Sequence, residues 1–344
     1  MKSLILKVSG KELFDFISRF GDVKAEDTLV VATTKSFNIK NQSRNAFKVI
    51  VNLNKINDIR NIDSFFADVN SKLSKDGIFV GCVESRDLRK RRLLKKFPPV
   101  LCYLYLAMDY VFKRVFPKLI LTSWFYFFIT DGRNRVISKP EAIGRLYYAG
   151  FSVIELKVIG NLLCFAVKKM QVPAQTGTPS YGPLLKMQRV GKDGRVIRVY
   201  KIRTMAPYSE FIQEYMYNKH HLQTNGKIEN DYRITRVGKL LRKFWLDETP
   251  MIYNWFCGDL KLVGVRPLSK HYLGLYTKEM MDKRLRHKPG LLPPYYADMP
   301  ANFEEILESE KRYLDAYEKE PFKTDVSYFF RIVSNIVFKG ARSQ

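Results

Sequence analysis

The sequence predicts an α/β domain followed by a helix-rich α+β domain, and three observations indicate this division. A chain of 344 residues is long for one domain, and each half is long enough to form its own core. Apolar runs of strand length alternate with helical spacing in residues 1–170, whereas helical spacing dominates residues 181–344. Residues 171–180 are polar and contain Pro and Gly, which is typical of a linker.

The first half is expected to contain strands at residues 4–8, 28–32, 48–53, 78–82, 151–158 and 162–168. Helices are expected at residues 62–73, before Lys75-Asp76-Gly77, and from Ser138 to near Gly150. The last two strands should form a hairpin across Gly160-Asn161. This order resembles the C-terminal half of class I methyltransferase-like domains, a Rossmann-type architecture. Because no Gly-x-Gly loop follows an early strand, we expect a degenerate domain for docking or regulation, without cofactor and without methyl transfer.

Inside the first half lies a basic cluster followed by two apolar runs, at residues 97–108 and 119–130. Each run is too short to span a bilayer. One interpretation is an attachment to anionic lipid, and the other is a pair of core helices with a solvated basic face. The basic cluster comprises Arg86, Arg89, Lys90, Arg91, Arg92, Lys95 and Lys96.

In the second half, Gly194 marks a β-turn before residues 195–202. The remaining pattern is helical, with a basic amphipathic segment at residues 236–244. Helices are expected at residues 209–217, 236–244, 270–285, 303–317 and 324–338.

An adjacent carboxylate pair, Asp247-Glu248, is the chemical centre of this half. Asp247 precedes Thr249-Pro250 and the run 251–256, so it can be the N-cap of a helix. Arginines surround the pair in the sequence, and a carboxylate among them can stay ionised and attack or coordinate phosphorus. The two interpretations are compatible.

The pair belongs to an ordered series of motifs that covers residues 181–344 and resembles the bacterial sugar transferase family. Members are polyprenyl-phosphate glycosyl-1-phosphate transferases, or phosphoglycosyl transferases, which begin capsule, exopolysaccharide and glycan-lipid assembly. The motifs are Gln188-Arg189-Val190-Gly191-Lys192-Asp193-Gly194, Tyr200-Lys201-Ile202-Arg203-Thr204-Met205, residues 232–250, Gly264-Val265-Arg266-Pro267 and Lys288-Pro289-Gly290.

The resemblance implies transfer of a sugar 1-phosphate from a nucleoside diphosphate sugar to a polyprenyl phosphate, with Mg²⁺ and an aspartyl-phosphosugar intermediate. It implies that Asp247 is the nucleophile and that Glu248 orients it or binds the metal. Bidentate guanidinium–phosphate pairing gives a physical reason for the many arginines. The implied substrate-binding residues are Arg189, Lys201, Arg203, Arg233, Arg242 and Arg266.

The chain departs from the family pattern at several places. Val265 stands at a position where the family usually has Pro, and Thr249 stands at a position where the family usually has Leu. After Pro289-Gly290, this chain has Leu291-Leu292-Pro293 in place of x-Thr-Gly. Members normally carry a membrane-entering helix before the Gly-Pro motif, a place taken here by the polar residues 171–180. These departures bear on the acceptor more than on the chemistry.

The net charge of +25 and the pI of about 9.8 require anionic partners or an anionic surface. Membrane phospholipid and nucleotide sugar account for this charge, and no nucleic-acid-binding motif is visible. No signal peptide is visible, and Cys82, Cys102, Cys164 and Cys257 lack metal-ligand spacing and are expected to be reduced core thiols. We therefore expect a cytoplasmic protein, peripheral on the inner face of the cytoplasmic membrane. An alternative is a catalytically silent partner that binds nucleotide sugar or a membrane complex and regulates glycan assembly.

Overall fold

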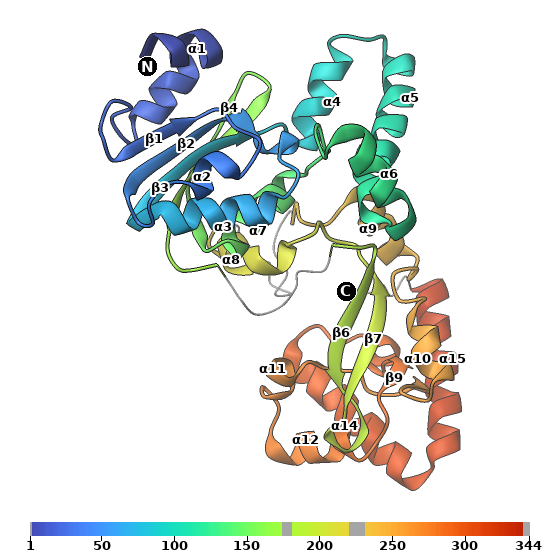
Figure 1. Cartoon of the computed structure of the whole chain (residues 1–344). Coiled ribbons are helices and arrows are strands. Elements are labelled where there is room, and N and C mark those ends of the chain that lie inside the picture. Colours follow the sequence, from blue (N-terminus) through green and yellow to red (C-terminus); the bar gives the residue numbers. More distant parts are fainter. Residues whose placement is uncertain (1, 174–180, 220–230, 340–344) are drawn as a thin grey trace. The chain divides into compact units, whose positions relative to one another are not determined.

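The computed structural model describes residues 2–173, 181–219 and 231–339, and it divides the chain into two compact units (Figure 1). Unit 1 comprises residues 1–181 and 206–218, and unit 2 comprises residues 182–205 and 219–344. Most of the predicted linker, residues 174–180, lies outside the described residues. Residues 206–218, which the sequence assigned to the second domain, therefore group with unit 1.

Unit 1 is built on a mixed five-stranded sheet in the order β1-β2-β3-β5-β4. The first three strands are parallel, and β5 runs antiparallel to both β3 and β4. The five strands predicted between residues 28 and 168 are confirmed, because their alternating apolar side chains enter cores on the two faces of the sheet. The strands are β1 (Thr28–Val31), β2 (Phe47–Lys55), β3 (Leu73–Val83), β4 (Phe151–Ile159) and β5 (Leu162–Lys169).

The prediction of a strand at residues 4–8 is wrong, because this segment belongs to helix α1 (Lys2–Ser18). The helix is interrupted at Gly10, where φ is 74°, and then continues. Leu13, Phe16 and Ile17 are spaced along one face of the helix and are buried against the sheet. The tertiary contact of this later half therefore outweighs the strand-like pattern before it.

The opposite face of the sheet is covered by α2 (Phe37–Lys40), α3 (Ile62–Lys72) and α7 (Lys139–Tyr148). Both predicted helices are confirmed: α7 begins at Ser138 as expected, where the Ser138 side chain accepts a hydrogen bond from Glu141 N, and α3 is capped by Asn61, whose side chain accepts from Ser64 N. Fully buried phenylalanines of helix and sheet pack edge to face, among them Phe66 and Phe79 at 5.8 Å between ring centroids. Each contributes about 1.5–3 kcal/mol through apolar burial.

The remainder of unit 1 is helical. The two apolar runs form helices as predicted, and Figure 1 shows α4 and α5 side by side. The segment 206–218 packs on α7, where Arg145 donates a hydrogen bond to the hydroxyl of Tyr208 at 3.0 Å. These elements are η1 (Ile56–Asp58), α4 (Arg86–Leu94), α5 (Pro99–Tyr110), η2 (Val111–Val115), η3 (Phe116–Lys118), α6 (Ile120–Thr130), η5 (Ser209–Ile212) and α8 (Gln213–Lys219).

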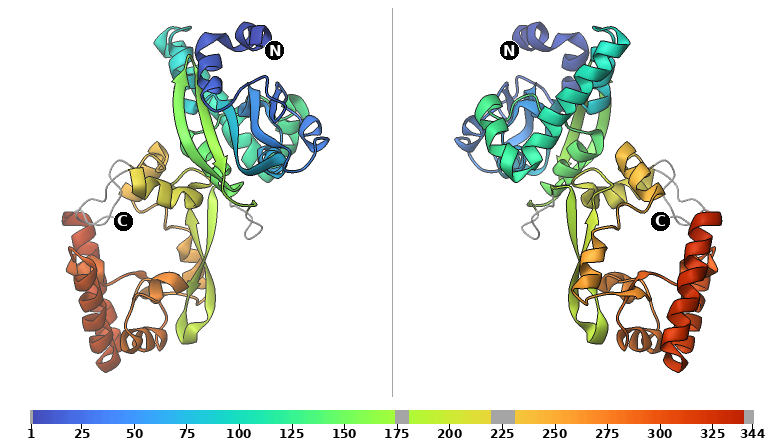
Figure 2. Two further views of the ribbon diagram at one scale, coloured as in Figure 1. Left: turned by 90° about the vertical axis from the view of Figure 1, so that its left-hand side faces the viewer. Right: turned by 90° about the vertical axis from the view of Figure 1, so that its right-hand side faces the viewer.

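Unit 2 contains an antiparallel hairpin, a two-stranded parallel sheet, seven α-helices and one short 3-10 helix within its described residues. The views in Figure 2 show the hairpin in light green and α15 in red on opposite sides of this unit. The predicted helices at 236–244, 303–317 and 324–338 are confirmed within a few residues. The elements are β6 (Leu184–Val190), η4 (Lys192–Gly194), β7 (Val196–Ile202), α9 (Arg236–Lys243), α10 (Met251–Phe256), β8 (Lys261–Val263), α11 (Lys270–Leu273), α12 (Lys278–Leu285), β9 (Gly290–Leu292), α13 (Tyr295–Asp298), α14 (Phe303–Lys319) and α15 (Pro321–Phe338).

Two predictions for unit 2 are corrected. The single helix predicted at 270–285 is two helices, because α11 ends at Leu273, before Gly274, and the side chain of Thr277 caps α12 by accepting a hydrogen bond from Met280 N. Cys257 is exposed at the end of α10 rather than a core thiol, whereas the other three cysteines are buried. In the described part of the chain, no helix is both long enough and apolar enough to span a bilayer.

Candidate active site

The carboxylate pair lies in the turn between α9 and α10. Trp245 begins this turn in the left-handed region, with φ of 62°, and its ring packs 4.2 Å from that of Tyr296 between centroids. The Glu248 carbonyl accepts a hydrogen bond from Met251 N at 2.8 Å, and Pro250 is the residue that precedes the helix. The predicted N-cap role of Asp247 is therefore wrong, because overlapping turns delay the helix start by several residues.

Strand β7 fixes the position of this turn. Ile202 N donates to the Asp247 carbonyl at 2.8 Å. The side chain of Asn254, fully buried in α10, accepts a hydrogen bond from Tyr200 N at 3.1 Å and donates to Arg198 O at 2.7 Å. Sequence reasoning missed Asn254, although an amide inside the mixed run 251–256 is a signal that it has a buried partner.

Asp247 and Glu248 are both buried, with 5% and 8% of their surface exposed. Lys201 forms an ion pair with Glu248 Oε1, whereas Asp247 Oδ1 is buried without a hydrogen-bond partner in the described structure. Burial, and then the charge of Glu248, raises the pKa of Asp247 above 3.8, against the opposing effect of Lys201 and Arg242. Burial also lowers the pKa of Lys201, although Glu248 opposes this.

Thr204, just after β7, holds α9 beside the carboxylates. Arg242 Nε donates to Thr204 Oγ1 at 2.9 Å, and Thr235 N donates to Thr204 O at 2.9 Å. A Cβ at Gly238 would lie 2.7 Å from the carbonyl carbon of Thr204 and closer still to its oxygen. Glycine is therefore required at this crossing; both residues lie in motifs of the sequence, but their packing role was not predicted.

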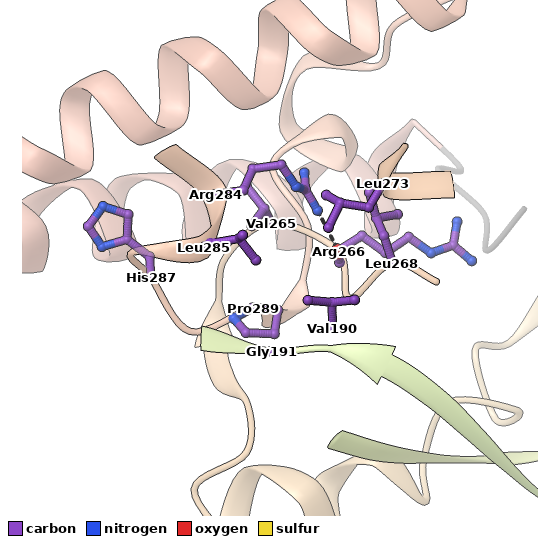
Figure 3. Close-up of a pocket in the computed structure, with 10 residues that line it drawn as sticks. All are labelled: Val190, Gly191, Val265, Arg266, Leu268, Leu273, Arg284, Leu285, His287 and Pro289. Atoms are coloured by element: carbon purple, nitrogen blue, oxygen red, sulfur yellow. Dashed lines mark hydrogen bonds between the residues drawn. The ribbon is translucent and has the colours of Figure 1, made fainter. Parts of the chain in front are cut away.

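Arg266 follows β8 and is placed by a close crossing of two backbones. A Cβ at Gly290 would lie 2.7 Å from Gly264 O, so the two glycine motifs pack directly on each other. Arg284 Nη2 donates to Arg266 O at 2.6 Å. Figure 3 shows the pocket beside this backbone, with the Arg266 side chain extending away from His287.

The Arg266 guanidinium donates no hydrogen bond within the described residues. Tyr295 and Tyr296 raise the pKa of Arg266, with Tyr295 the larger cause and burial acting against both. The electrostatic coupling of Arg266 to Glu248, Lys201 and Arg242 places these groups in one region of unit 2. The structure thus brings together four of the predicted site residues around Asp247.

The other three predicted substrate-binding residues have protein partners. Arg233 is buried and forms a bidentate pair with Asp231 at 2.9 and 2.7 Å. Arg203 Nε donates to Gly182 O at 2.8 Å. Arg189 donates to Gln188 O at 2.8 Å, and burial, with the nearby charge of Arg266, lowers the pKa of Arg189.

Asp247 and Glu248 fit a magnesium ion only if a substrate phosphate supplies further oxygen ligands. Among the described residues, no group of three or more His, Cys, Asp or Glu side chains could hold a metal ion. Asp247 Oδ1, the unpartnered oxygen, and Glu248 offer the one or two carboxylates that Mg²⁺ commonly uses, with substrate phosphates and water completing its shell.

An exposed apolar surface flanks the carboxylate turn. Large apolar side chains of α9, the turn and α10 face solvent, with Phe244 58% and Phe256 77% exposed. An apolar surface of this kind is typical of a contact with an apolar partner. Its other members are Val237, Leu240, Leu246, Ile252, Tyr253 and Trp255.

The family model for bacterial sugar transferases matches residues 152–339, more than half of the chain, beginning within β4. A galactosyl transferase, CpsE, of Streptococcus agalactiae is 34% identical over 168 residues, which are 46% of this chain and 36% of the relative. An undecaprenyl-phosphate galactose phosphotransferase of Salmonella typhimurium is 38% identical over 109 residues, which are 30% of this chain and 23% of the relative. The chain thus spans about a quarter to a third of the length of these relatives.

Solved structures named as S-adenosylmethionine-dependent methyltransferases are among the structural neighbours. A putative one from Listeria monocytogenes covers 48% of this chain and 99% of its own, at 11% identity and a TM-score of 0.29. A TM-score of this size does not establish a shared fold. The methyltransferase-like character of residues 1–170 therefore stays a prediction.

Proposed function

The chain belongs to the bacterial sugar transferase family, and from that premise we propose that it transfers a sugar 1-phosphate from a nucleoside diphosphate sugar to a polyprenyl phosphate. The reaction would begin the assembly of an exopolysaccharide, capsule or glycan lipid. Relatives named for undecaprenyl phosphate and for UDP-sugars support both substrate classes.

Asp247 is the nucleophile in this proposal. Its carboxylate oxygen forms a bond to the phosphorus next to the sugar, the bond from that phosphorus to the bridging oxygen breaks, and nucleoside monophosphate leaves. A phosphate oxygen of the polyprenyl phosphate then attacks the same phosphorus and releases Asp247. The products are a polyprenyl diphosphate sugar and the regenerated carboxylate.

The basic residues around Asp247 bind and orient the phosphates. Arg266 has a guanidinium without a hydrogen-bond partner in the described structure, so it can pair with a diphosphate at no cost in lost internal contacts. Arg242 and Lys201 supply positive charge beside the attacking oxygen. Mg²⁺, held by Asp247 or Glu248 together with substrate phosphates, would neutralise charge on the transferred group.

The unpartnered Oδ1 of Asp247 is the observation that carries this proposal. A buried carboxylate oxygen without a hydrogen bond costs folding free energy, about 1–3 kcal/mol or more for a charged group. The chain tolerates this cost at a carboxylate on which the charges of Lys201 and Arg242 act, and positive charge beside an attacking oxygen favours phosphoryl transfer.

The exposed apolar side chains beside the turn support a lipid acceptor. Phe244 and Leu246 stand next to the carboxylates in the chain and face solvent, so an isoprenoid chain can approach along them. A lipid acceptor implies that the protein works at a membrane. We place it peripherally on the cytoplasmic face, in keeping with its basic charge.

The test is intact-mass spectrometry of the full chain incubated with Mg²⁺ and a panel of nucleoside diphosphate sugars, without acceptor. Wild type should gain the mass of one sugar phosphate, and Asp247→Asn should gain none. Asp282→Asn, at an exposed position of α12, is the matched control and should react as wild type does. An adduct on Asp247→Asn would remove Asp247 from its role, and a folded wild type that reacts with no donor would favour the silent-partner alternative.

A further inference from the structure

Helices α5 and α6 of unit 1 each expose a row of large apolar side chains to solvent. On α5, Val100, Leu104 and Met108 lie one turn apart and are 82%, 63% and 67% exposed. On α6, Leu121, Trp124 and Phe128 are 91%, 72% and 76% exposed. We call the surface made by these six side chains the outer surface of α5 and α6. In water, an exposed apolar surface of this extent is unfavourable unless a partner covers it.

The charged side chains of this segment point away from the outer surface. Residues 97–130 contain four charged residues, and Asp109 and Arg114 are both buried. Asp109 accepts hydrogen bonds from Arg89 Nε and Nη2, each at 2.8 Å, and it also pairs with Lys113. Arg114 pairs with the buried Glu141. The polarity of α5 is therefore inverted relative to a helix that faces water, whose charged side lies outward.

Several other polar groups of this segment also have partners within unit 1. Lys118, the fourth charged residue, lies 4.7 Å from the centre of the Tyr181 ring. On α6, Thr122 donates to Phe116 O at 2.9 Å, and Thr130 donates to Tyr126 O at 2.8 Å. Because the Thr122 and Thr130 hydroxyls are bonded within the segment, they lose no hydrogen bond where water is excluded.

The end of α4 provides a basic edge beside the outer surface. In the predicted basic cluster, Arg89 and Arg92 donate hydrogen bonds to the buried Glu84, so these two side chains are not available to a lipid headgroup. Arg91, Lys95 and Lys96 remain exposed, directly before α5 in the chain. Positive charge at the border of an apolar surface complements anionic phosphate headgroups above a layer of acyl chains.

We propose that the outer surface of α5 and α6 rests in the interfacial layer of an anionic phospholipid bilayer, with Arg91, Lys95 and Lys96 against the headgroups. Helices of 12 and 11 residues suit a position in the plane of the interface. Trp124 is of the residue type that favours this layer. The outer surface of α5 and α6 lies wholly in unit 1, so its contact with a membrane is independent of the proposed transfer reaction.

The first test is flotation of the full chain with vesicles of phosphatidylcholine containing about a quarter phosphatidylglycerol. The triple variant Leu104→Glu, Leu121→Glu, Phe128→Glu should lower vesicle binding at least about tenfold, because three charges would have to enter the apolar layer. Phe37→Glu changes a side chain that is 68% exposed on α2 and is the matched control. It should bind as wild type does, and binding of both should weaken in pure phosphatidylcholine or high salt.

A second measurement needs no disruptive variant. Acyl-brominated lipid should quench tryptophan fluorescence of the wild type, and Trp124→Phe should lose much of the quenched emission while the other two tryptophans report unchanged folding. Three results would each overturn the proposal. They are a wild type that does not bind the vesicles, a triple variant that binds the vesicles as well as wild type, and quenching of Trp124→Phe emission equal to that of wild type. A dimer that the triple variant dissociates, with flotation unchanged, would assign this surface to a second copy instead.

Discussion

Replacing Gly238 by alanine sets two opposing effects against each other in α9. In an isolated helix, alanine is favoured over glycine by about 1 kcal/mol. In this protein the new Cβ would meet the Thr204 backbone, 2.7 Å from its carbonyl carbon, and a backbone cannot rotate aside as a side chain can. Helix α9 would have to move away from the end of β7.

The clash should exceed the gain in helix propensity. Forced overpacking costs about 1–3 kcal/mol. Moving α9 also breaks the hydrogen bonds from Thr235 and Arg242 to Thr204, each worth about 1 kcal/mol. We therefore expect a net loss of about 2–4 kcal/mol in the stability of unit 2, together with slower formation of the sugar-phosphate adduct, since Arg242 leaves Asp247.

Val237→Ala is the matched control, because Val237 is the neighbouring residue of α9 and is 60% exposed. That substitution should leave stability unchanged or raise it by about 0.5 kcal/mol. The assay is guanidinium denaturation, with amide hydrogen exchange over residues 231–245 to assign the loss to this part of unit 2. A Gly238→Ala protein as stable as wild type, with unchanged exchange, would refute the packing of α9 on Thr204.

Two further predictions concern Arg266 and Asp247. Gly290→Ala should push the backbone at Gly264 and displace Arg266, which should raise the donor concentration for half-maximal adduct formation at least about tenfold. Gly182→Ala is the control, because the space around its Cβ is open, and it should leave this concentration unchanged. Equal donor dependence of the two variants would contradict the prediction. Because burial raises the pKa of Asp247, the acidic limb of the adduct-forming rate should lie above pH 3.8. The folded state binds the proton of the Asp247 carboxyl more tightly than the unfolded chain does. The wild type should therefore lose stability relative to Asp247→Asn as pH rises through the raised pKa of Asp247. A stability difference between the two proteins that is independent of pH would exclude the raised pKa.

Local pattern was sufficient for most elements of the fold. The strands at 28–32 and 48–53 were predictable because their side chains alternate between the two sheet faces, and Ser138 marked a helix start through its own hydrogen bond. The strand predicted at 4–8 failed because a short run of four Leu, Ile and Val residues around Lys7 is compatible with the periods of both a strand and a helix. There, the burial of Phe16 and Ile17 against the sheet decided for a helix.

The candidate site was predictable in its residues but not in their roles. Asp247 and Arg266 stand in motifs that the sequence displays, whereas the bidentate pair of Arg233 with Asp231 appears only in the structure. The residue Asn254 and the role of Thr204 were missed because their hydrogen-bond partners lie on other elements of unit 2, far away in the chain. A hydrogen bond over such a separation leaves no local pattern to read.

The sequence by itself determined the division into two halves, the order of the motifs and the family, because these depend on residue type and spacing along the chain. Only the tertiary structure decided that Asp247 keeps a buried, unpartnered oxygen in the described site, and that α5 turns Asp109 inward and its leucines outward. The physical reason is that burial and pairing depend on neighbours brought from distant segments. The same residue type can therefore be a helix cap or a nucleophile, and the same apolar run can be a core helix or a membrane contact.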